Sequence, residues 1–587
     1  MNAKLRQLLS LALLTANSLA NANCSSNLGT SCGNTILTDT VNSENCLPQT
    51  VKEEGYGQTF LSLRPAHSDM ARDMMGTDSR IHHFGKVDLN GDVSLALQWQ
   101  QSNSSIGMGE WFFFNGSNAM TYGPNWDSQK YNIVDVNSLN FATTASGTIT
   151  ASPRVEELIA DFQFYFGWDE FAPGLWTRVG IPVNYIRTDM RLIDSVSIYD
   201  ANAAADATGA FNCFNQGDFT NIPLVPYDSN TANTVPFPNL AAAWVGNNDN
   251  NLVGAGDWDG RFNGNINGPQ TDASVSGLVL EAGYDVWRQE AGHLGFSARL
   301  VVPTGSVPTT NYLFDAVVGN TGCFELGAGL TSAYELYNDS DSRSLNFYLN
   351  MNATHLFSRK QKRMMGLTGL RNGSTNGSTL PSPGAPWLIL AQYNANGFYN
   401  GSLVSAADLT SLVVKIHNTV MVDLAATIKY CSSNYGFEVG YNFWVRTKDV
   451  ATNREASAFA NNVNYYGVKP ASGNHGSATI LDYNVSQSVA NLSESNISST
   501  GATITSVTPS DIFAQCFTDA NISVCPALQP TTMSNKVFAS LEYNWNDSEW
   551  EPYLLLGATY EVGCKFNEIK NSSVNQWSVI AKGGLAF

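Results

Sequence analysis

The sequence predicts an all-β protein, a transmembrane antiparallel up-and-down β-barrel of about 14–16 strands with short periplasmic turns and long external loops. Three observations predict this fold. Apolar and polar residues alternate in many segments, the connections between these segments alternate between short and long, and the chain ends on an amphipathic stretch whose last residue is Phe587. A tilted strand crosses a bilayer in about nine to eleven residues, and a closed barrel leaves no strand edge unpaired.

The N-terminus carries the pattern of a secretory signal peptide. Lys4 and Arg6 precede an apolar run at residues 8–14, and Ala20-Asn21-Ala22 supplies a small-residue cleavage site. We therefore expect a signal peptide at 1–22, a periplasmic N-terminal segment at 23–56, and an outer-membrane β-barrel at 57–587.

Alternating segments define the expected strands, about fourteen in number. The number is even if both termini are periplasmic, and it rises to about sixteen if the long segment after residue 190 or after residue 448 contains another hairpin. In chain order the expected strands cover residues 58–64, 86–100, 107–115, 157–167, 175–188, 276–288, 292–302, 323–337, 344–357, 413–430, 435–447, 536–545, 551–564 and 576–587.

The connections between these strands are of two kinds. Short turns rich in Asp, Asn, Gly, Ser or Pro are expected at 168–174, 289–291, 338–343, 431–434 and 546–550. Long polar segments lie at 116–156, 190–274, 303–322, 358–412 and 448–535. Loops of that length count against strands in a soluble domain, whereas an outer-membrane barrel has long external loops.

In a strand, the parity of a residue's position, odd or even, assigns its side chain to one of the two faces. In residues 551–564 one face includes Leu554, Leu556 and Tyr560, and the other includes Thr559 and Glu561. The first face is expected to contact outer-membrane lipid and the second to face the lumen.

The inward faces carry a set of charged residues that we expect to line a pore. Carboxylates outnumber basic groups in this set, which favours a weak cation preference, unless the charges pair across strands and set no selectivity. The expected pore-lining residues are Asp161, Arg178, Glu281, Asp285, Arg299, Glu325, Glu335, Asp423, Lys429, Glu438, Arg446, Glu542, Glu561 and Lys582.

A long loop that folds inward would narrow the pore. The segment 190–274 is the candidate by its length, and Asp249, Asp257 and Asp259 are the candidate constriction residues. The same oxygen-rich run is compatible with calcium, but its spacing matches no EF-hand, so turn formation is the simpler explanation.

Composition and motifs argue against several classes of function. Only 14% of the residues are charged, and the formal net charge of −19 disfavours nucleic acid as a partner. The seven histidines fit no zinc-ligand spacing and no metalloprotease helix, and the chain has no phosphate-binding glycine loop. We therefore expect no catalytic residues, no metal and no cofactor.

The nine cysteines are compatible with an oxidising compartment. Their odd number leaves one thiol free or paired between chains, so a disulfide-linked oligomer is a hypothesis, and the connectivity stays open although Cys516 and Cys525 could close a local loop. The disulfide candidates are Cys24, Cys32, Cys46, Cys213, Cys323, Cys516, Cys525 and Cys564.

The terminal strand, residues 576–587, is expected to close the barrel by pairing with 551–564 and with the first strand at 58–64. Trp577, Leu585 and Phe587 lie on its lipid face and form the expected signal for the barrel-assembly machinery.

Two blocks at the ends of the mature chain resemble a known family. Residues 57–61, read Gly-Gln-Thr-Phe-Leu and followed by Arg64-Pro65, and Trp577 with Lys582-Gly583-Gly584, are similar to those of the cysteine-bearing major outer-membrane porins of chlamydia-related and other intracellular bacteria. The resemblance implies a bacterial outer-membrane location, passive diffusion of small hydrophilic solutes or ions, homotrimers, and a role as a surface antigen. It transfers no individual functional residue.

Several functions remain open at this point. A porin is the first expectation, a non-conducting structural or adhesive surface barrel cross-linked by disulfides is the alternative, and a barrel-type hydrolase is the third. Recurring Asn-x-Ser sequons also allow a secreted glycoprotein, but such a protein leaves the terminal strand unexplained.

Overall fold

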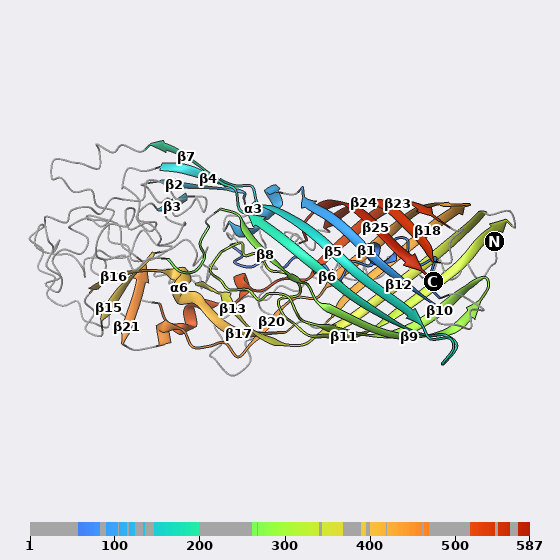
Figure 1. Cartoon of the computed structure of the whole chain (residues 1–587). Helices are drawn as coiled ribbons and strands as arrows, with labels where there is room; N and C mark the ends of the chain where they lie inside the picture. The colour runs from blue at the N-terminus through green and yellow to red at the C-terminus, as the bar shows by residue number, and fades with distance from the viewer. Residues whose placement is uncertain are drawn as a thin grey trace, which may run out of the picture.

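Figure 1 shows a computed structural model of the chain. The structure describes residues 57–82, 90–103, 105–113, 117–123, 133–135, 146–198, 261–266, 268–339, 343–367, 389–394, 399–417, 420–460, 463–468, 517–545, 550–563 and 573–587.

Twelve antiparallel strands form a closed barrel, which confirms the predicted all-β barrel fold. Each strand pairs with the next one in the ring, and β1 closes the ring by pairing with both β5 and β25. The strands are β1 (Asn90–Ser102), β5 (Arg154–Gly167), β6 (Leu175–Asp189), β9 (Leu278–Gln289), β10 (Gly292–Val302), β11 (Glu325–Asp339), β12 (Arg343–Leu356), β18 (Met421–Ser432), β19 (Tyr435–Arg446), β23 (Thr532–Asn544), β24 (Glu551–Gly563) and β25 (Gln576–Ala586). A short strand, β8 (Gln270–Val275), extends β9 along β6.

The number of strands is therefore smaller than the predicted 14–16, because two expected strands are not part of the wall. Residues 58–64 have no strand structure; they are buried or half-buried and lead from the long-loop end into the barrel. Residues 107–112 lie in the helix α3 (Ser105–Phe112), and residues 114–115 fall outside the described part of the chain. Trp111, Phe112 and the following Phe113 are buried in succession, unlike the alternating side chains of a strand with one exposed face. The other twelve expected segments supply the twelve barrel strands. The segment 413–430 contributes β18, and its first part belongs to β17 (Ser411–His417) outside the barrel.

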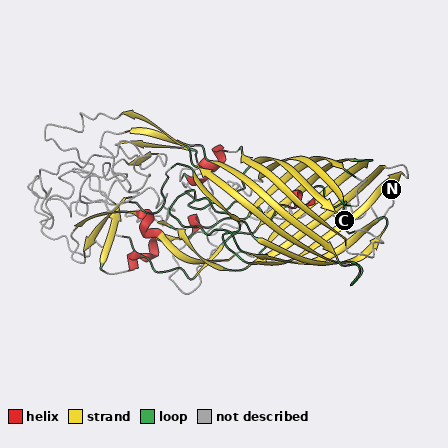
Figure 2. Ribbon diagram, viewed as in Figure 1, coloured by secondary structure: helices red, strands yellow, loops and turns green. Residues whose placement is uncertain are grey.

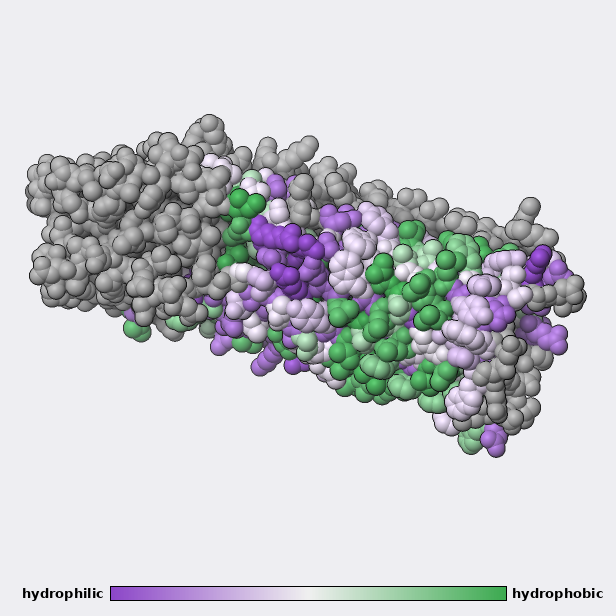
Figure 3. Space-filling model, turned by 45° about the horizontal axis from the view of Figure 1, so that its top comes forward, coloured by the Kyte–Doolittle hydropathy of each residue, from purple (hydrophilic) through white to green (hydrophobic). Residues whose placement is uncertain are grey.

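The outer face of the barrel is apolar, as parity predicts. In β24, Leu554, Leu556 and Tyr560 are exposed, whereas Thr559 and Glu561 are buried on the inner side. Side chains of this kind form a broad hydrophobic area on the barrel surface in Figure 3. An apolar outer band is the surface that contacts lipid in a membrane barrel.

Aromatic pairs stand near both ends of the wall. Trp99 and Trp577 make an edge-to-face contact, with ring centroids 4.9 Å apart, at one end. At the other end Tyr435 contacts Tyr543 with centroids 5.1 Å apart. Aromatic girdles at both interfaces are typical of membrane barrels, so these pairs mark the limits of the apolar band.

The two ends of the barrel differ, which confirms the predicted alternation of connections. At the short-turn end, compact connections join β5 to β6, β9 to β10, β11 to β12, β18 to β19 and β23 to β24, and both Asn90 and Phe587 lie there. At the long-loop end the described connections form their own β-structure, which extends well beyond the barrel in Figure 1.

Four smaller sheets make up this extension. They contain β2 (Ala119–Gly123), β3 (Ile133–Asp135), β4 (Ser146–Ala151) and β7 (Leu192–Ile198); β13 (Arg359–Met364), β17 and β20 (Val450–Thr452); β14 (Gly366–Leu367) and β22 (Ile522–Ser523); and β15 (Ile389–Asn394), β16 (Tyr399–Ser405) and β21 (Asn464–Val468). Short helices α6 (Ala406–Thr410), η4 (Ala458–Ala460), η5 (Asp519–Asn521) and η6 (Cys525–Ala527) lie between these strands. None of the helices in the described part of the chain is long and apolar enough to cross a membrane.

The C-terminal strand closes the wall, but its second neighbour differs from the prediction. β25 pairs with β24, as predicted, and with β1 instead of residues 58–64. The amide of Phe587 donates to the carbonyl of Gly91 at 3.0 Å, and the Gly91 amide donates to the Phe587 carbonyl at 2.9 Å. A Cβ atom at Gly91 would lie 2.6 Å from the Phe587 ring, so only glycine fits beside this ring.

Candidate functional site in the barrel lumen

In the described part of the chain, residues 57–82 occupy the barrel interior, and we name them the lumen segment. It starts at the long-loop end, where the amide of Gln58 donates to the Trp111 carbonyl at 3.0 Å and the amide of Thr59 donates to the Pro526 carbonyl at 2.8 Å. Its last residue, His82, lies near the short-turn end. Figure 2 shows the short helix of this segment among the barrel strands.

That helix, α2 (Met70–Met74), has apolar side chains on two sides. Met70 and Met74 lie one turn apart and pack against Tyr348 and Ala425 on the wall. Ala71 and Met75 pack on the other side, against a second group of inward-facing wall residues, which are Ala96, Phe538, Leu555 and Ile580. Burying a methionine side chain contributes about 1.5–3 kcal/mol, so these contacts hold the segment in place without any strand pairing.

Around this helix, charged side chains of the segment meet the wall at three levels. Nearest the long-loop end, the Arg64 guanidinium lies 3.0 Å from the Asp423 carboxylate and 3.3 Å from Glu561. The Asp69 carboxylate lies 2.9 Å from the ammonium group of Lys536, which also lies 3.1 Å from Glu561. All five side chains are nearly inaccessible to solvent, so this level is a closed ion-pair network.

The middle level joins α2 to three wall strands. The Arg72 Nε atom lies 3.0 Å from an Asp161 carboxylate oxygen, and Asp73 lies 3.1 Å from the guanidinium of Arg178. The Lys582 Nζ atom donates to the backbone carbonyls of Arg72 at 3.3 Å and Asp73 at 3.2 Å. These contacts fix both the side chains and the backbone of the helix.

The third level lies toward the short-turn end. Arg80 pairs with the carboxylate of Glu542, which also lies 2.8 Å from the Lys429 Nζ atom. The backbone amide of Gly76 donates to the carboxylate of Glu438 at 3.3 Å. Gly76 has a φ of 72°, a conformation that glycine adopts without strain, and the turn directs its amide to the wall.

The charges of the lumen segment complement those of the wall. Its three arginines, Arg64, Arg72 and Arg80, stand eight residues apart in the sequence and reach the three levels in turn. Removing one partner of a buried ion pair costs about 3–5 kcal/mol because a charge is left buried and unpaired. The segment also carries three aspartates, Asp69, Asp73 and Asp78, so its arginines and aspartates balance and pair with wall groups of both signs.

The predicted pore-lining residues mostly face this segment, so their inward direction agrees with the prediction, but they do not border an open pore in this structure. Glu281 pairs with Arg299 at 3.6 Å and Arg446 with Asp449 at 3.2 Å, while Glu335 is partly exposed toward the short-turn end. Those that bond to the lumen segment are Asp161, Arg178, Asp285, Arg299, Glu325, Asp423, Lys429, Glu438, Glu542, Glu561 and Lys582.

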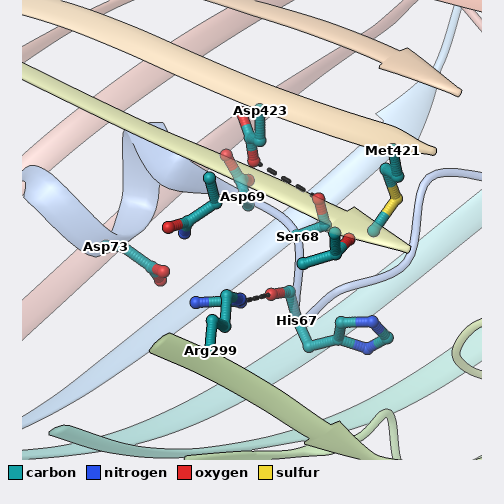
Figure 4. Close-up of a pocket in the computed structure, with 9 residues that line it drawn as sticks. His67, Ser68, Asp69, Asp73, Arg299, Met421 and Asp423 are labelled. Carbon is teal, nitrogen blue, oxygen red and sulfur yellow. Dashed lines mark hydrogen bonds between the residues drawn. The ribbon is translucent and has the colours of Figure 1, made fainter. Parts of the chain in front are cut away.

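A narrow pocket remains between the lumen segment and the wall (Figure 4). Its lining includes His67, Ser68 and Asp423, and its other lining residues are Asp69, Asp73, Arg299, Asn352, Thr354 and Met421. The Ser68 hydroxyl donates to Asp423 at 3.3 Å, and the Arg299 guanidinium donates to the His67 carbonyl at 2.8 Å. The pocket is polar, and its charged lining groups already have partners in the segment or the wall.

The long-loop end of the lumen is covered by a buried arginine. The Arg363 guanidinium lies over the Phe60 ring, 3.2 Å from its centroid, and 3.6 Å from the Asp449 carboxylate. Burial lowers the pKa of Arg363 to about 10, so it stays charged at neutral pH. A cation on an aromatic ring is a favourable contact, and here it fixes the start of the lumen segment.

The remaining predicted sites have different outcomes. The constriction candidates Asp249, Asp257 and Asp259 fall outside the described residues. Of the assembly-signal residues, Leu585 faces outward and is exposed, and Trp577 and Phe587 lie at opposite ends of β25. Recognition of these residues by assembly machinery stays a prediction.

Two described cysteines are free, which corrects one disulfide candidate. Cys323 is a buried free thiol at the long-loop end, and Cys431 is also free. Cys525 is bonded in a disulfide whose partner lies outside the described residues. A bond to Cys516 agrees with the predicted local loop but stays a prediction, as do the predictions for Cys24, Cys32, Cys46, Cys213 and Cys564, which fall outside the described residues.

Large apolar residues at inward-facing positions indicated in the sequence that the lumen is filled, and an assignment of faces by parity alone does not reveal this. Phe538, Leu555 and Ile580 occupy inward positions although they are large and apolar. Water in an open pore would hydrate these side chains unfavourably, so their presence indicates that protein covers them.

One group of three possible metal ligands also forms in the lumen. His82, Asp285 and His293 bring one ligand atom each within 4.8 Å of the others, and all three are buried. No spacing rule finds this group because its members come from the lumen segment, β9 and β10. Parity places both Asp285 and His293 on the inner face, so two of its members were accessible from the sequence.

Comparison with protein-family models finds no match for this chain, and comparison with curated proteins finds none either. Among solved structures, an outer membrane channel from Pseudomonas putida F1 shows 8% identity and a TM-score of 0.30, covering 86% of this chain and 98% of that one. The translocator domain of the autotransporter NalP from Neisseria meningitidis shows 6% identity and a TM-score of 0.26, covering 89% and 96%. A FadL homologue from Pseudomonas aeruginosa shows 8% identity and a TM-score of 0.25, covering 92% and 98%.

The location follows from the architecture itself. In lipid every backbone polar group needs an internal partner, and a closed barrel with an apolar outer band meets that need. Antiparallel barrels with short turns at one end and long loops at the other are outer-membrane proteins of bacteria. The protein is therefore an outer-membrane β-barrel, as predicted, while its resemblance to the chlamydial-type porins stays a prediction because no family match accompanies it.

Proposed function

We propose that this protein is an outer-membrane channel for small hydrophilic solutes or ions, and that its own lumen segment closes it. One observation carries the proposal: the twelve-strand wall is complete without the lumen segment. The segment is held by side-chain contacts and by backbone bonds to Trp111 and Pro526 at the long-loop end. Its departure would leave a closed barrel whose lumen is lined mainly by charged and polar side chains, with one apolar group at Ala96, Phe538, Leu555 and Ile580.

The size of the barrel supports a narrow channel. About eight strands enclose an interior that side chains fill, whereas porins of about 16–18 strands leave a wide aqueous channel. Twelve strands lie between these sizes and leave room for one chain segment. Small solutes are therefore the proposed cargo.

A weak cation preference follows for the open state. Removal of the segment would free the wall carboxylates that pair with Arg64, Arg72 and Arg80, and also Arg178 and Lys536, which pair with its aspartates. The preference therefore rests on the excess of carboxylates among the inward-facing residues of the wall itself. Wall pairs such as Lys429 with Glu542 limit the preference, because they persist without the segment.

The sidedness is proposed from the loop lengths. The short-turn end is periplasmic and the long-loop end external. The signal peptide at 1–22 and the periplasmic segment at 23–56 fall outside the described residues, and Gln58 lies at the long-loop end. Trimer formation, disulfide cross-linking and recognition as a surface antigen are further proposals, and we expect no catalytic activity.

Conductance of a deletion variant tests the channel. The full chain and a variant lacking residues 57–82 are refolded, checked for heat-modifiable migration, and inserted into planar bilayers. We expect few or small conductance steps from the full chain and frequent, larger steps from the variant, with a reversal potential that favours the cation in a salt gradient. A variant that inserts but gives no steps would contradict the channel, and an anion-favouring potential would contradict the selectivity alone.

A surface-binding barrel is the second candidate, and the long-loop extension favours it. Two separate apolar clusters stabilise this extension, one around Phe459 and Tyr466 and the other around Val414 and Ile416. An ordered extension of this kind offers a binding surface outside the membrane. A folded deletion variant that does not conduct would favour this second function.

A further inference from the structure

The geometry at the short-turn end points to a binding site for a divalent transition-metal cation, which we infer to be formed by His82, Asp285 and His293. The His82 Nδ1 atom lies 3.0 Å from an Asp285 carboxylate oxygen. The rings of His82 and His293 stack with centroids 4.1 Å apart and an angle of 20° between their planes. Three ligands of this type thus converge from three elements of the chain.

The local structure of the wall directs two of these ligands to one point. The pairing of β9 with β10 shifts register at Leu294 and Gly295, where a β-bulge gives β9 one extra residue. Val286 and Trp287 are both exposed at this bulge, so the alternation restarts and Asp285 remains on the inner face. A Cβ atom at Gly295 would lie 2.4 Å from the Asp285 carboxylate, so glycine makes room for this ligand.

An unpaired nitrogen is the independent sign of a ligand. His293 is only 5% exposed, and its Nε2 atom has no hydrogen-bond partner in the described part of the chain. A buried polar atom without a partner costs about 1–3 kcal/mol. A metal ion bound by this nitrogen removes that cost.

The third ligand comes from the lumen segment and has an unusual backbone. His82 has a φ of 63°, in the left-handed region that residues with a side chain seldom adopt. Such conformations cluster at binding sites, where surrounding contacts hold them. Tyr165 and Trp176 provide these contacts, with ring centroids 5.3 Å and 5.2 Å from that of His82.

The donor set selects the class of metal. Imidazole nitrogen and carboxylate oxygen suit Zn²⁺ and its first-row neighbours, and three protein ligands leave a fourth position for water. Ligand bonds of about 2.0–2.2 Å place the ligand atoms of a tetrahedral site about 3.3 Å apart. The present separations lie within 4.8 Å, and one of the two stacked imidazole rings turns out of the stack when both direct a nitrogen lone pair at the same ion. Trp176 Nε1 donates to the second Asp285 oxygen at 3.2 Å and orients the carboxylate.

The metal would bond the end of the lumen segment to the barrel wall. His82 belongs to the segment, whereas Asp285 and His293 belong to β9 and β10. A bound ion therefore favours the docked segment, and its removal favours release. This gating role rests on the proposed channel function, but metal binding itself does not.

Equilibrium dialysis of the full-length protein with Zn²⁺ tests the site. The protein is first freed of metal with a chelator, and the bound zinc is then measured per chain. We expect one zinc ion fewer in His293→Ala and in His82→Ala than in the unchanged protein, with affinity at this site weakened by at least about 100-fold, because changes around metal ligands alone cost 10–100-fold. His417→Ala, on β17 outside the barrel, is the matched control and should bind as the unchanged protein does.

Two results separate this site from the channel proposal. Equal zinc content in the unchanged protein and in both variants would overturn the metal site. If His293→Ala fails to fold, His82→Ala still provides the test, because His82 is not part of the wall. Zinc-dependent closure is then measured by conductance before and after a chelator, with closure lost in His82→Ala. Normal zinc binding by the full-length protein, together with no conductance from the deletion variant, would retain the site and reject the channel.

Discussion

The outer and inner faces of the same strands were predictable to different degrees. On the outer face, residues such as Leu554 and Leu556 are exposed in the alternating pattern that the sequence predicts. On the inner face, Asp161 and Glu561 point inward as predicted, but they contact arginines of the lumen segment instead of water. The difference shows that local periodicity determines where a side chain points, whereas long-range contacts determine what it meets.

The largest effect is expected inside the lumen. Arg72→Ala leaves the Asp161 carboxylate buried without its partner, which we expect to destabilise the docked segment by about 3–5 kcal/mol. Limited proteolysis of the folded barrel measures this as faster cleavage within residues 57–82. Adding Asp161→Asn should recover part of the protection, and unchanged proteolysis of Arg72→Ala would contradict the ion-pair account.

A charge on the outer face should have the next largest effect. Leu556 is 63% exposed on β24, and Leu556→Arg would place a cation in the hydrocarbon at a cost of about 2–4 kcal/mol near the bilayer midplane. Urea unfolding in lipid vesicles measures this loss. Val463→Arg, equally exposed but beyond the barrel, is the control and should change the unfolding free energy by less than about 0.5 kcal/mol. Similar losses for both variants would show that Leu556 does not face lipid.

Deletion of Phe587 tests the closure of the wall. It removes the two hydrogen bonds with Gly91, each worth about 0.5–1.5 kcal/mol, together with the ring contact to Trp550. We expect less assembled protein at the cell surface and little change in the conductance of the molecules that do assemble. Surface labelling measures the first quantity, and normal surface levels would argue against an assembly role for this residue.

The smallest effect is expected for an exposed ion pair. Arg187 lies 3.3 Å from Glu156 with 41% of its side chain exposed, and pairs of this kind contribute about 0–1 kcal/mol. Arg187→Ala should therefore leave both urea unfolding and proteolysis almost unchanged. A loss as large as that of Arg72→Ala would remove the distinction between lumen and surface arginines.

Much of the wall was predictable because its signals are local. Twelve of the expected segments became barrel strands, since each has its own period-two pattern and the turn chemistry that ends it. The segment 58–64 also alternates, and alternation alone does not distinguish a strand in a ladder from an extended chain inside a barrel. The strand number was wrong for this reason and because most of the segment 107–115 forms the helix α3.

The lumen contacts were not predictable because their partners are far apart in the sequence. Arg64 meets Glu561, and His82 meets Asp285, across hundreds of residues. The eight-residue spacing of Arg64, Arg72 and Arg80 was visible in the sequence, but its meaning depends on which wall carboxylates stand at each level. Parity identified the few wall carboxylates that face the lumen, but it did not indicate which arginine each of them contacts.

The central claim is that side-chain contacts of the lumen segment keep the barrel closed. Single-channel conductance of a variant with Arg64→Ala, Arg72→Ala and Arg80→Ala tests it most directly. The control carries Arg154→Ala, Arg187→Ala and Arg191→Ala, which remove the same number of charges at exposed or partly exposed positions. The account predicts frequent open events in the first variant and a closed barrel in both the control and the unchanged protein. Equal conductance in all three folded proteins would contradict it.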